Sequence, residues 1–352
     1  MRRMQVAAVG LLLVLFAGQF VSVDFAVINS VEEQNWEKVW NKQVDATIRS
    51  LIRQVDCERM TKNLFYLAKS PLPYRKLNFT LPGHEKNTLY EADAYISGKL
   101  ESGGYPVERE EARVQAFRRD VTKPIHTQFS PPMPEDPWFT AYNLYAVKKG
   151  SSHPDEIILL IAHKDSQSWI DSPGANDNGS GTITALEIAT VLAKYPSRRT
   201  IRFLFCNEEH TPWTSITAAK NAKARGDNII AVFNLDSVGV KSAEDRAAGK
   251  KINLTAYTKP EGERLAELMG AVNVRYAIGL EQRTIKRPRP GDDDGSFVNA
   301  GFPVTVRNAG SLPNADPNYH TPGDIPELCD VKNAAMVAQA TLAAVVTLDQ
   351  EP

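Results

Sequence analysis

Five short polar stretches of the 352-residue chain carry side chains of the types that bind divalent metal ions. Most of them come directly after an apolar, strand-like run, and the last lies near the C-terminus. In chain order they hold His163, Asp177, the pair Glu208 and Glu209, Asp236, and His320. Two imidazoles with several carboxylates and no thiolate form a ligand set that suits zinc in a catalytic site rather than a structural one. The pattern therefore indicates metal-dependent chemistry.

The adjacent pair Glu208 and Glu209 ends the strand-like run IRFLFCN. Side chains at neighbouring strand positions point to opposite faces, so the two carboxylates either form a solvated strand end or divide two roles. A hydrolase with two metal ions needs such a division, because one carboxylate binds metal and another takes a proton from the attacking water. The other groups then give five ligands for two ions, and one carboxylate must bridge them.

Each of these signals, taken alone, has a simpler explanation. Asp236 by itself is more typical of a turn or helix cap, and His163 of a buried core histidine. The segment GANDNGSG around Asp177 by itself is compatible with an ordinary turn before a helix. We favour the metal site because all of the groups occur in order at the places where loops leave strands.

The scaffold that positions these groups is predicted from the alternation of strands and helices. Strands are predicted at residues 109–117, 141–147, 156–162, 200–205, 229–235 and 304–306. Helices are predicted at residues 89–103, 180–195, 215–225, 260–272 and 333–346, and residues 32–68 also carry helical spacing. The alternation predicts an α/β fold, with a mixed, mostly parallel central sheet sandwiched between helices, in a single domain over residues 30–350. Ligands of such sheets bind beyond the carboxyl ends of the strands.

The segments AHKDS, PGANDNGSG, FCNEEH, FNLDSVG and NYHTPGD, in this order, resemble the motifs of the co-catalytic zinc exopeptidase family. That family includes secreted bacterial aminopeptidases, glutamate carboxypeptidase-type enzymes and glutaminyl cyclases. The resemblance covers about residues 40–350 and implies the zinc exopeptidase-like, phosphorylase/hydrolase-like fold with two co-catalytic zinc ions.

The resemblance also implies a role for each residue at the matching positions. Asp177 would bridge both ions, with His163 and Asp236 on one ion and Glu209 and His320 on the other. Glu208 would be the general base, and Asp165 would orient His163. A cis peptide between Asp177 and Asn178 is implied as well.

Two segments depart from the family pattern. The stretch from His210 to Ser215 reads HTPWTS, where the family has glycine and Gly-Ser, so Trp213 and its neighbour proline alter the wall of the substrate pocket. The family's Ser-Asp-His-x-x-Phe segment corresponds to DDDGSF, which places Asp294 where a substrate-contacting histidine is usual. His210 itself is expected to be a pocket or packing residue, because His163 and His320 already complete the ligand set.

The implied function is a zinc-dependent exopeptidase, and an aminopeptidase is the favoured form. Two alternatives on the same fold are a glutaminyl-peptide cyclase, which needs one metal, and a non-enzymatic receptor-like homologue. Trp169, Trp213 and Tyr319 lie beside the ligands and are candidates for the substrate pocket, with ordinary packing as the alternative. Binding of a free α-amine needs a further acidic group. The run Asp292–Asp294 offers candidates, although a solvated acidic loop is the simpler interpretation.

The net charge and the N-terminal residues limit which binding partners and which cellular location are expected. A formal net charge of -1 disfavours nucleic acid or an anionic membrane as the main partner, so a peptide or amino-acid-derived substrate is expected. Arg2 and Arg3 followed by an apolar run predict a signal peptide at residues 1–23, with an uncleaved anchor as the alternative. The protein is therefore expected to be periplasmic or secreted, with no further membrane-spanning segment. Of the three cysteines, Cys57 and Cys329 could pair, or all three could be buried thiols.

Overall fold

The computed structural model describes residues 11–16, 19–24, 36–311 and 315–352. Within these residues, a nine-stranded sheet has the order β12-β11-β13-β10-β7-β8-β6-β3-β9. Its strands are β3 (Val107–Ala116), β6 (Trp138–Lys148), β7 (His153–His163), β8 (Arg199–Cys206), β9 (His210–Thr211), β10 (Asn228–Leu235), β11 (Ile252–Tyr257), β12 (Glu281–Lys286) and β13 (Thr305–Ala309). The four central strands β8, β7, β10 and β13 are parallel, and antiparallel pairs occur toward both edges. The predicted α/β fold with a mixed central sheet is confirmed.

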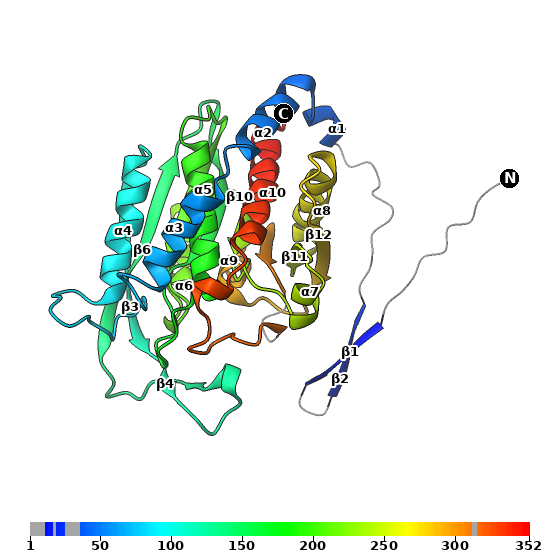
Figure 1. The fold of residues 1–352 in the computed structure, drawn as a ribbon. Helices are drawn as coiled ribbons and strands as arrows, with labels where there is room; N and C mark the ends of the chain where they lie inside the picture. The colour runs from blue at the N-terminus through cyan, green and yellow to red at the C-terminus, as the bar shows by residue number, and fades with distance from the viewer. Residues whose placement is uncertain (1–10, 17–18, 25–35, 312–314) are drawn as a thin grey trace.

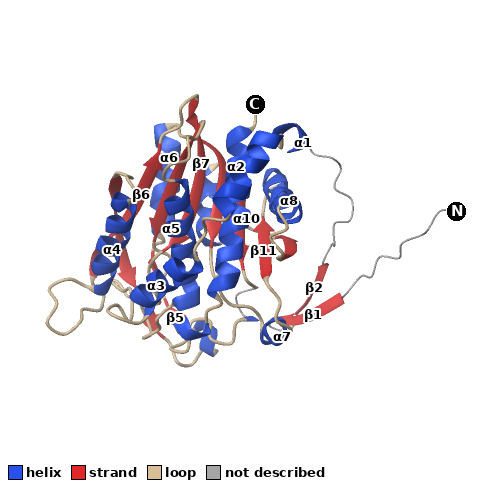
Figure 2. Cartoon of the chain, turned by 45° about the horizontal axis from the view of Figure 1, so that its top comes forward, coloured by secondary structure: helices blue, strands red, loops and turns tan. Residues whose placement is uncertain are grey.

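Helices cover both faces of this sheet (Figures 1 and 2). They are α1 (Trp36–Val39), α2 (Lys42–Ile52), α3 (Cys57–Ala68), α4 (Thr88–Ser102), α5 (Gly181–Leu192), α6 (Thr214–Arg225), α7 (Ala243–Ala247), α8 (Pro260–Arg275), α9 (Asp292–Ala300) and α10 (Val331–Gln350). Shorter turns are η1 (Ile125–Thr127), η2 (Ala175–Ser180) and η4 (Pro326–Leu328).

The apolar run of β7 explains why two helical layers are needed. Ile158, Leu160 and Ala162 join the large core formed with α2–α5, α8 and α10. Ile157, Leu159 and Ile161 alternate with them and pack into a second core with α6 and α9. Because a strand buried on both faces has no polar side, its sequence is continuously hydrophobic rather than alternating.

Several elements differ from the prediction. Within the predicted helical region, the described residues 36–68 form separate helices, because Asn41 accepts hydrogen bonds from the first turn of α2 and Asp56 does the same for α3. Strands β11 and β12 were not predicted, and β12 reads EQRTIK, as expected for a partly exposed edge strand. Helix α9 was also missed, because its first turn is the aspartate run; acidic residues there are favoured by the helix dipole.

The N-terminal and C-terminal apolar segments have different surroundings. Strands β1 (Leu11–Phe16) and β2 (Gln19–Asp24) pair with each other, and residues 1–10 lie outside the described residues, so the signal peptide at residues 1–23 stays a prediction. Among the described residues, α10 is long and apolar enough to span a membrane, but 78% of that stretch is buried inside the protein. Helix α10 is therefore a core helix.

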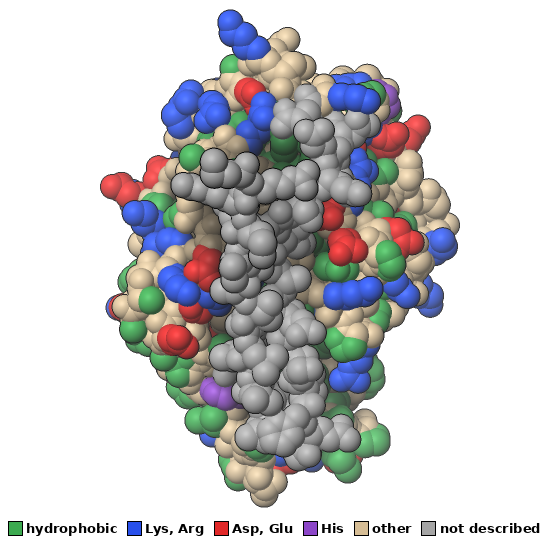
Figure 3. All heavy atoms as spheres, turned by 90° about the vertical axis from the view of Figure 1, so that its right-hand side faces the viewer, with side chains coloured by type: hydrophobic (Ala, Val, Ile, Leu, Met, Phe, Trp, Pro, Cys, Tyr) green, Lys and Arg blue, Asp and Glu red, His purple; other side chains and the backbone are tan. Residues whose placement is uncertain are grey.

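The three cysteines, which all lie in the described residues, are not paired with one another, and the surface visible in Figure 3 carries charges of both signs. Within the described part of the chain, Cys57, Cys206 and Cys329 are all free thiols, so the Cys57–Cys329 pairing is not formed. Cys57 is exposed, which corrects the alternative that all three are buried. On the face shown in Figure 3, Lys and Arg side chains lie interspersed with Asp and Glu. This mixture agrees with the near-zero net charge.

Candidate metal centre

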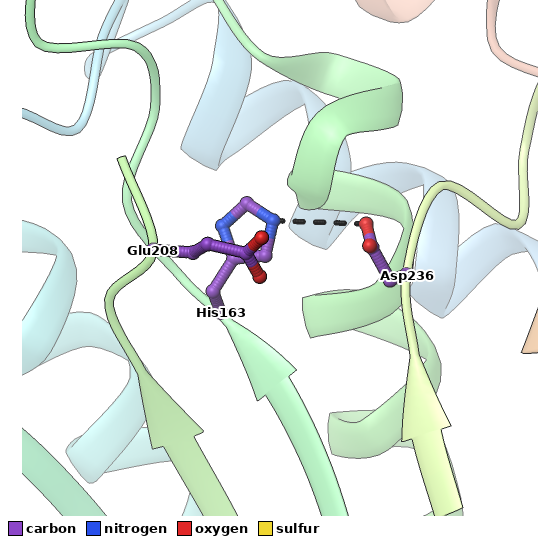
Figure 4. A group of neighbouring side chains, drawn as sticks. All are labelled: His163, Glu208 and Asp236. Carbon is purple, nitrogen blue, oxygen red and sulfur yellow. Dashed lines mark ion pairs between the residues drawn. The ribbon is translucent and has the colours of Figure 1, made fainter. Parts of the chain in front are cut away.

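The carboxyl ends of the central strands bring the predicted groups together. His163 is the last residue of β7, Glu208 and Glu209 follow β8, and Asp236 follows β10. Asp177 lies in η2, the turn that precedes α5. Figure 4 shows the Glu208 carboxylate beside the His163 ring, with Asp236 on a neighbouring strand end.

Two His–carboxylate groups face the two oxygen atoms of Asp177. On one side His163 Nε2 lies 3.2 Å from Asp177 Oδ1 and 3.6 Å from Asp236 Oδ1. On the other side His320 Nε2 lies 3.1 Å from Asp177 Oδ2 and 3.4 Å from Glu209 Oε1. The predicted ligands therefore form two groups that share Asp177.

These separations fit zinc. Ligand atoms at the usual zinc–nitrogen and zinc–oxygen distances of about 2.0–2.1 Å are separated by about 3.3 Å when the geometry is tetrahedral. One ligand atom from each of His163, Asp177 and Glu209 lies within 4.8 Å of the other two, and the same holds for His163, Glu208 and Asp236. The cluster is buried, so the carboxylates gain from a cation that compensates their charge.

The turn that carries Asp177 is fixed by hydrogen bonds to two other segments, through the Asp324 side chain and the Leu235 backbone. The Asp324 carboxylate accepts hydrogen bonds from the backbone N–H groups of Asn176 and Asp177, at 2.8 and 3.0 Å. Asn178 donates to the Leu235 carbonyl oxygen at 2.9 Å, and the peptide between Asp177 and Asn178 is cis, as the resemblance implies. Gly181 is required here, because a Cβ at this position would lie 2.0 Å from the Leu235 oxygen.

Asp165 organises the strand end at the centre of the site. Its carboxylate accepts hydrogen bonds from His163 Nδ1 at 3.3 Å and from His210 Nδ1 at 2.7 Å. The backbone N–H groups of Glu208 and Glu209 each donate to it at 2.9 Å. Burial acts to raise the pKa of Asp165, but the hydrogen bonds from the two histidines outweigh it and hold the pKa well below its ordinary value. His210 is therefore a buried partner of Asp165, in line with its predicted packing role.

Replacing Asp165 by Ala is expected to weaken zinc binding about 10–100-fold, as is typical when the partner of a ligating histidine is lost. The physical reason is that His163 loses the acceptor that fixes its ring. Zinc affinity, measured by competition with a chromophoric chelator, checks this, and Asp155→Ala on an exposed position of β7 is the control. Unchanged affinity in the Asp165 variant would contradict the role given to this residue.

The Glu208 side chain is held differently from that of Glu209, whose Oε1 accepts a hydrogen bond from Gln167. Glu208 is partly buried, and within the described residues its Oε2 atom has no hydrogen-bond partner. Burial, followed by the charges of Asp293 and Asp292, raises the pKa of Glu208 well above its ordinary value. A carboxylate that is basic and unengaged is suited to proton transfer.

The aspartate run before Phe297 is not a solvated loop, so that interpretation was wrong. Asp293 and Asp294 are fully buried in the first turn of α9, and burial raises the pKa of each to about 6. Asp294 pairs with Arg287 and accepts a hydrogen bond from Asn234. Asp292 pairs with Arg287 at 2.9 Å and with Arg307 at 2.8 Å. Asp293 accepts a hydrogen bond from the Cys206 thiol, whereas its Oδ1 has no partner in the described structure.

Aromatic rings surround His320. Tyr319 stacks on it with ring centroids 3.7 Å apart, and Trp169 meets it edge-on at 5.0 Å. Two of the three predicted pocket residues therefore lie at the site. Trp213 immediately precedes α6 and is partly buried, and its role in the pocket stays a prediction.

The facing carboxylates also affect the proton on His320. Burial acts to lower its pKa, but Glu209 and Asp177 outweigh this and raise the pKa of His320 to about 10. A metal ion bound here must displace that proton. Zinc binding is therefore expected to release protons and to weaken as pH falls.

Sequence reasoning missed several residues at the site. Gln167 is buried, and its amide nitrogen donates to Glu209 Oε1 at 2.8 Å and to Asp177 Oδ2 at 3.1 Å. Arg307 pairs with Asp236 Oδ2 at 2.9 Å, opposite the oxygen that faces His163. His126 and Phe129 reach His320 from the segment that joins β3 to β6. The position of Gln167 two residues after Asp165 was the one available signal; the others depend on long-range contacts.

Comparison with known proteins decides the family. A sequence model described as Peptidase family M28 matches residues 143–345, which is more than half of the chain. The chain belongs to peptidase family M28. The matched region contains all five predicted ligands of the M28 site, and the resemblance drawn from the motifs is confirmed.

Individual M28 relatives are more distant. The chain is 32% identical over 197 residues to Aminopeptidase YwaD of Bacillus subtilis, covering 53% of this chain and 40% of that protein. It is 28% identical over 257 residues to a probable zinc metalloprotease of Pyrenophora teres f. teres, covering 60% and 52%. The chain thus spans about half the length, or less, of these curated relatives.

Solved structures share the M28 fold. The aminopeptidase from Aneurinibacillus sp. strain AM-1 has a TM-score of 0.63 at 17% identity, covering 85% of this chain and 95% of that one. A glutaminyl cyclase of Bacteroides thetaiotaomicron has a TM-score of 0.61 at 18% identity, covering 83% and 97%. At these identities the likeness concerns the fold.

Proposed function

We propose that the protein is a two-zinc aminopeptidase that removes residues from the free amino end of peptides. The observation that carries the proposal is the geometry around Asp177, whose two oxygens each face a His–carboxylate pair at the spacing of zinc ligands. His163 and Asp236 would hold one ion, Glu209 and His320 would hold the other, and Asp177 would contribute to both. The aminopeptidases among the relatives support this assignment.

Zinc bound by these five residues would supply Lewis acidity, which polarises the scissile carbonyl and makes the attacking water more acidic. Glu208 takes a proton from that water while the water oxygen bonds to the carbonyl carbon. The carbon–nitrogen bond then breaks, and Glu208 returns the proton to the leaving nitrogen. Asp165 keeps the His163 ring and the Glu208 backbone in place throughout.

The charges around Glu208 support binding of a substrate amine rather than a carboxylate. Among the described residues near Asp292, the positive charges of Arg287 and Arg307 are each offset by two carboxylates, although the buried Nε–H of each has no acceptor. Glu208 Oε2 and Asp293 Oδ1 are buried acceptors without a partner in the same region of the structure. An ammonium group would satisfy such acceptors, because it carries three donors and a positive charge.

Replacing Asp293 by Asn is expected to lower kcat/KM for substrates with a free amino end about 10–100-fold. A hydrogen bond to a charged group contributes about 1.5–3 kcal/mol, and the variant removes the charge while keeping the side-chain size. Steady-state kinetics on aminoacyl p-nitroanilides measures the effect. Asp294→Asn is the matched control, because Asp294 pairs with Arg287, and it should change stability more than kcat/KM. An equal loss in both variants would contradict the amine-binding role.

A second candidate function is glutaminyl-peptide cyclisation. The Bacteroides thetaiotaomicron glutaminyl cyclase shares the fold over most of both chains, and the fold alone does not separate the two reactions. We rank this second because a cyclase needs one metal, whereas the chain supplies ligands and charge for two. A receptor-like protein without activity has no need for five ligands and a free Glu208.

The test is an assay of zinc-loaded protein against aminoacyl, carboxy-terminal and N-glutaminyl substrates, with and without a chelator. The proposal expects hydrolysis of aminoacyl substrates that a chelator abolishes and zinc restores. Pyroglutamate formation without hydrolysis would establish the cyclase instead, and turnover that survives complete zinc removal would contradict a metallopeptidase.

We further propose that the protein is exported, from the basic and apolar residues at its N-terminus. N-terminal sequencing of the protein from the periplasm or medium should begin close to residue 24. Recovery from membranes with an intact N-terminus would indicate the anchor instead, and recovery only from the cytoplasm would contradict export.

A further inference from the structure

The segment of residues 117–137, here called the flap, joins β3 to β6 and lies beside the metal centre. It contains β4 (Arg118–Arg119), β5 (Phe129–Ser130) and η1. Strands β4 and β5 form a two-stranded sheet apart from the main one, and in Figure 1 the region around β4 extends beyond the body of the protein. Val121 and Ile125 near its tip are exposed, at 67% and 55%. Such a segment has few buried contacts of its own and opens more easily than the core.

The flap and the turn carrying His320 exchange two hydrogen bonds. His320 Nδ1 donates to the backbone oxygen of His126 at 2.9 Å, and His126 Nδ1 donates to the backbone oxygen of Tyr319 at 2.5 Å. Both acceptors are carbonyl oxygens, so both Nδ1 atoms must carry hydrogen. The Nε2 atom of His320 is then the unprotonated one in the neutral ring, and this is the atom that faces Asp177 and Glu209.

The two histidines of the metal centre are therefore held differently. His163 donates to Asp165, which is two residues away and fully buried at the strand end. His320 depends on a backbone carbonyl in the flap, and its own φ of 56° is in the left-handed region, which non-glycine residues seldom adopt. Phe129 of the flap packs edge-on against His320 as well, with ring centroids 5.9 Å apart. Without the flap, the His320 ring would lose its acceptor and one aromatic neighbour.

An ion pair and two hydrogen bonds fix the two ends of the flap. The Arg118 guanidinium makes a two-pronged ion pair with Asp136, at 2.6 and 2.7 Å. Gln115 donates to the Asp136 backbone oxygen at 2.9 Å, and the Phe117 N–H donates to Ser168 Oγ at 3.0 Å. These contacts hold the two ends of the flap together, close to Trp169 and the site.

We propose that the flap positions His320, so that the zinc ion shared by Glu209 and His320 is bound tightly only when the flap is closed. His126 is the positioning residue: its ring binds the Tyr319 carbonyl and its own carbonyl binds the His320 ring. The zinc ion on the His163 side is independent of the flap. This inference rests on the proposed two-zinc centre. It adds that zinc affinity depends on the flap in the half that contains His320 and not in the half that contains His163.

The experiment is a zinc titration of the full-length protein after chelation, with competition by a chromophoric chelator and native mass spectrometry to count ions. His126→Ala keeps the backbone oxygen that accepts from His320 and removes only the ring bond to the Tyr319 carbonyl. It should therefore weaken binding of the second zinc ion about tenfold, the low end of the range for loss of an outer hydrogen-bond partner, and leave the first within about twofold. His126→Asn should restore most of the affinity, because its amide nitrogen can replace Nδ1 as the donor. Ile125→Ala, an exposed neighbour in the same turn, is the matched control. Arg118→Ala, which releases the base of the flap, should reproduce the His126→Ala effect in weaker form.

The possible results of the titration distinguish failure of the flap inference from failure of the proposed function. A wild-type protein that binds a single zinc ion would overturn the two-zinc proposal. Two ions in wild type, with unchanged second-ion affinity in His126→Ala, would overturn the flap inference and leave the function standing. Equal weakening of both ions in His126→Ala, with a lower melting temperature before zinc is added, would also overturn it, because the effect would then be general loss of structure.

Discussion

Replacing Glu208 by Gln is expected to lower kcat about 10²–10⁴-fold while both zinc ions remain bound, since this is the range that a positioned general base contributes. The amide keeps the shape of the side chain but cannot accept the proton of the attacking water. Zinc retention is expected because the five ligands lie elsewhere, and because the Glu208 backbone bond to Asp165 is unaffected.

The measurement combines steady-state kinetics with a zinc count on the same sample. Glu261→Gln, on the exposed first turn of α8, is the matched control and should behave as wild type. If the Glu208 variant keeps more than about a tenth of the wild-type kcat, another group acts as the base. If it loses zinc, Glu208 is a ligand, as its proximity to His163 and Asp236 also permits.

Replacing Asp177 by Asn should affect both halves of the centre at once. The carboxylate offers Oδ1 to the His163 side and Oδ2 to the His320 side, whereas an amide offers one oxygen and no charge. We expect the loss in zinc affinity to exceed the about 10–100-fold typical of outer partners, and peptidase activity to disappear with it. Gln167 Nε2 donates to Asp177 Oδ2 in the wild type. An amide nitrogen placed there by the Asn variant would leave two donors facing each other.

The Asp177 prediction is checked by zinc affinity and stoichiometry, with Asp155→Asn as the control for loss of an exposed carboxylate. Parallel weakening of both ions supports the bridge. Loss of one ion with normal affinity for the other would show that Asp177 serves one half only, and the bridging role would have to be abandoned.

The ligand groups were predictable because the parallel strands end at one edge of the sheet. His163, Glu209 and Asp236 each lie at or just beyond the end of a largely apolar run, and such runs are read directly from the sequence. The cis turn at Asp177 and the position of His320 were accessible through the resemblance to a family, since no periodicity marks them.

What could not be predicted depends on contacts between distant segments. The bond from His320 to His126 joins residues 194 positions apart, and the flap sequence shows neither alternation nor helical spacing. The burial of Asp293 and Asp294 required Arg287 and α6 as neighbours, whereas the run of three aspartates alone is typical of solvent. Residues 32–68 were predicted as one stretch of helical spacing, and the N-caps Asn41 and Asp56 show where separate helices α2 and α3 begin.

The positions of bound zinc test the proposed two-zinc centre most directly. Anomalous diffraction at the zinc absorption edge, from crystals of the zinc-loaded protein, should show two peaks on either side of the Asp177 carboxylate. One peak is expected beside His163 and Asp236, and the other beside Glu209 and His320. A single peak in fully zinc-loaded crystals, or two peaks that do not share Asp177, would contradict a two-zinc aminopeptidase centre in this protein.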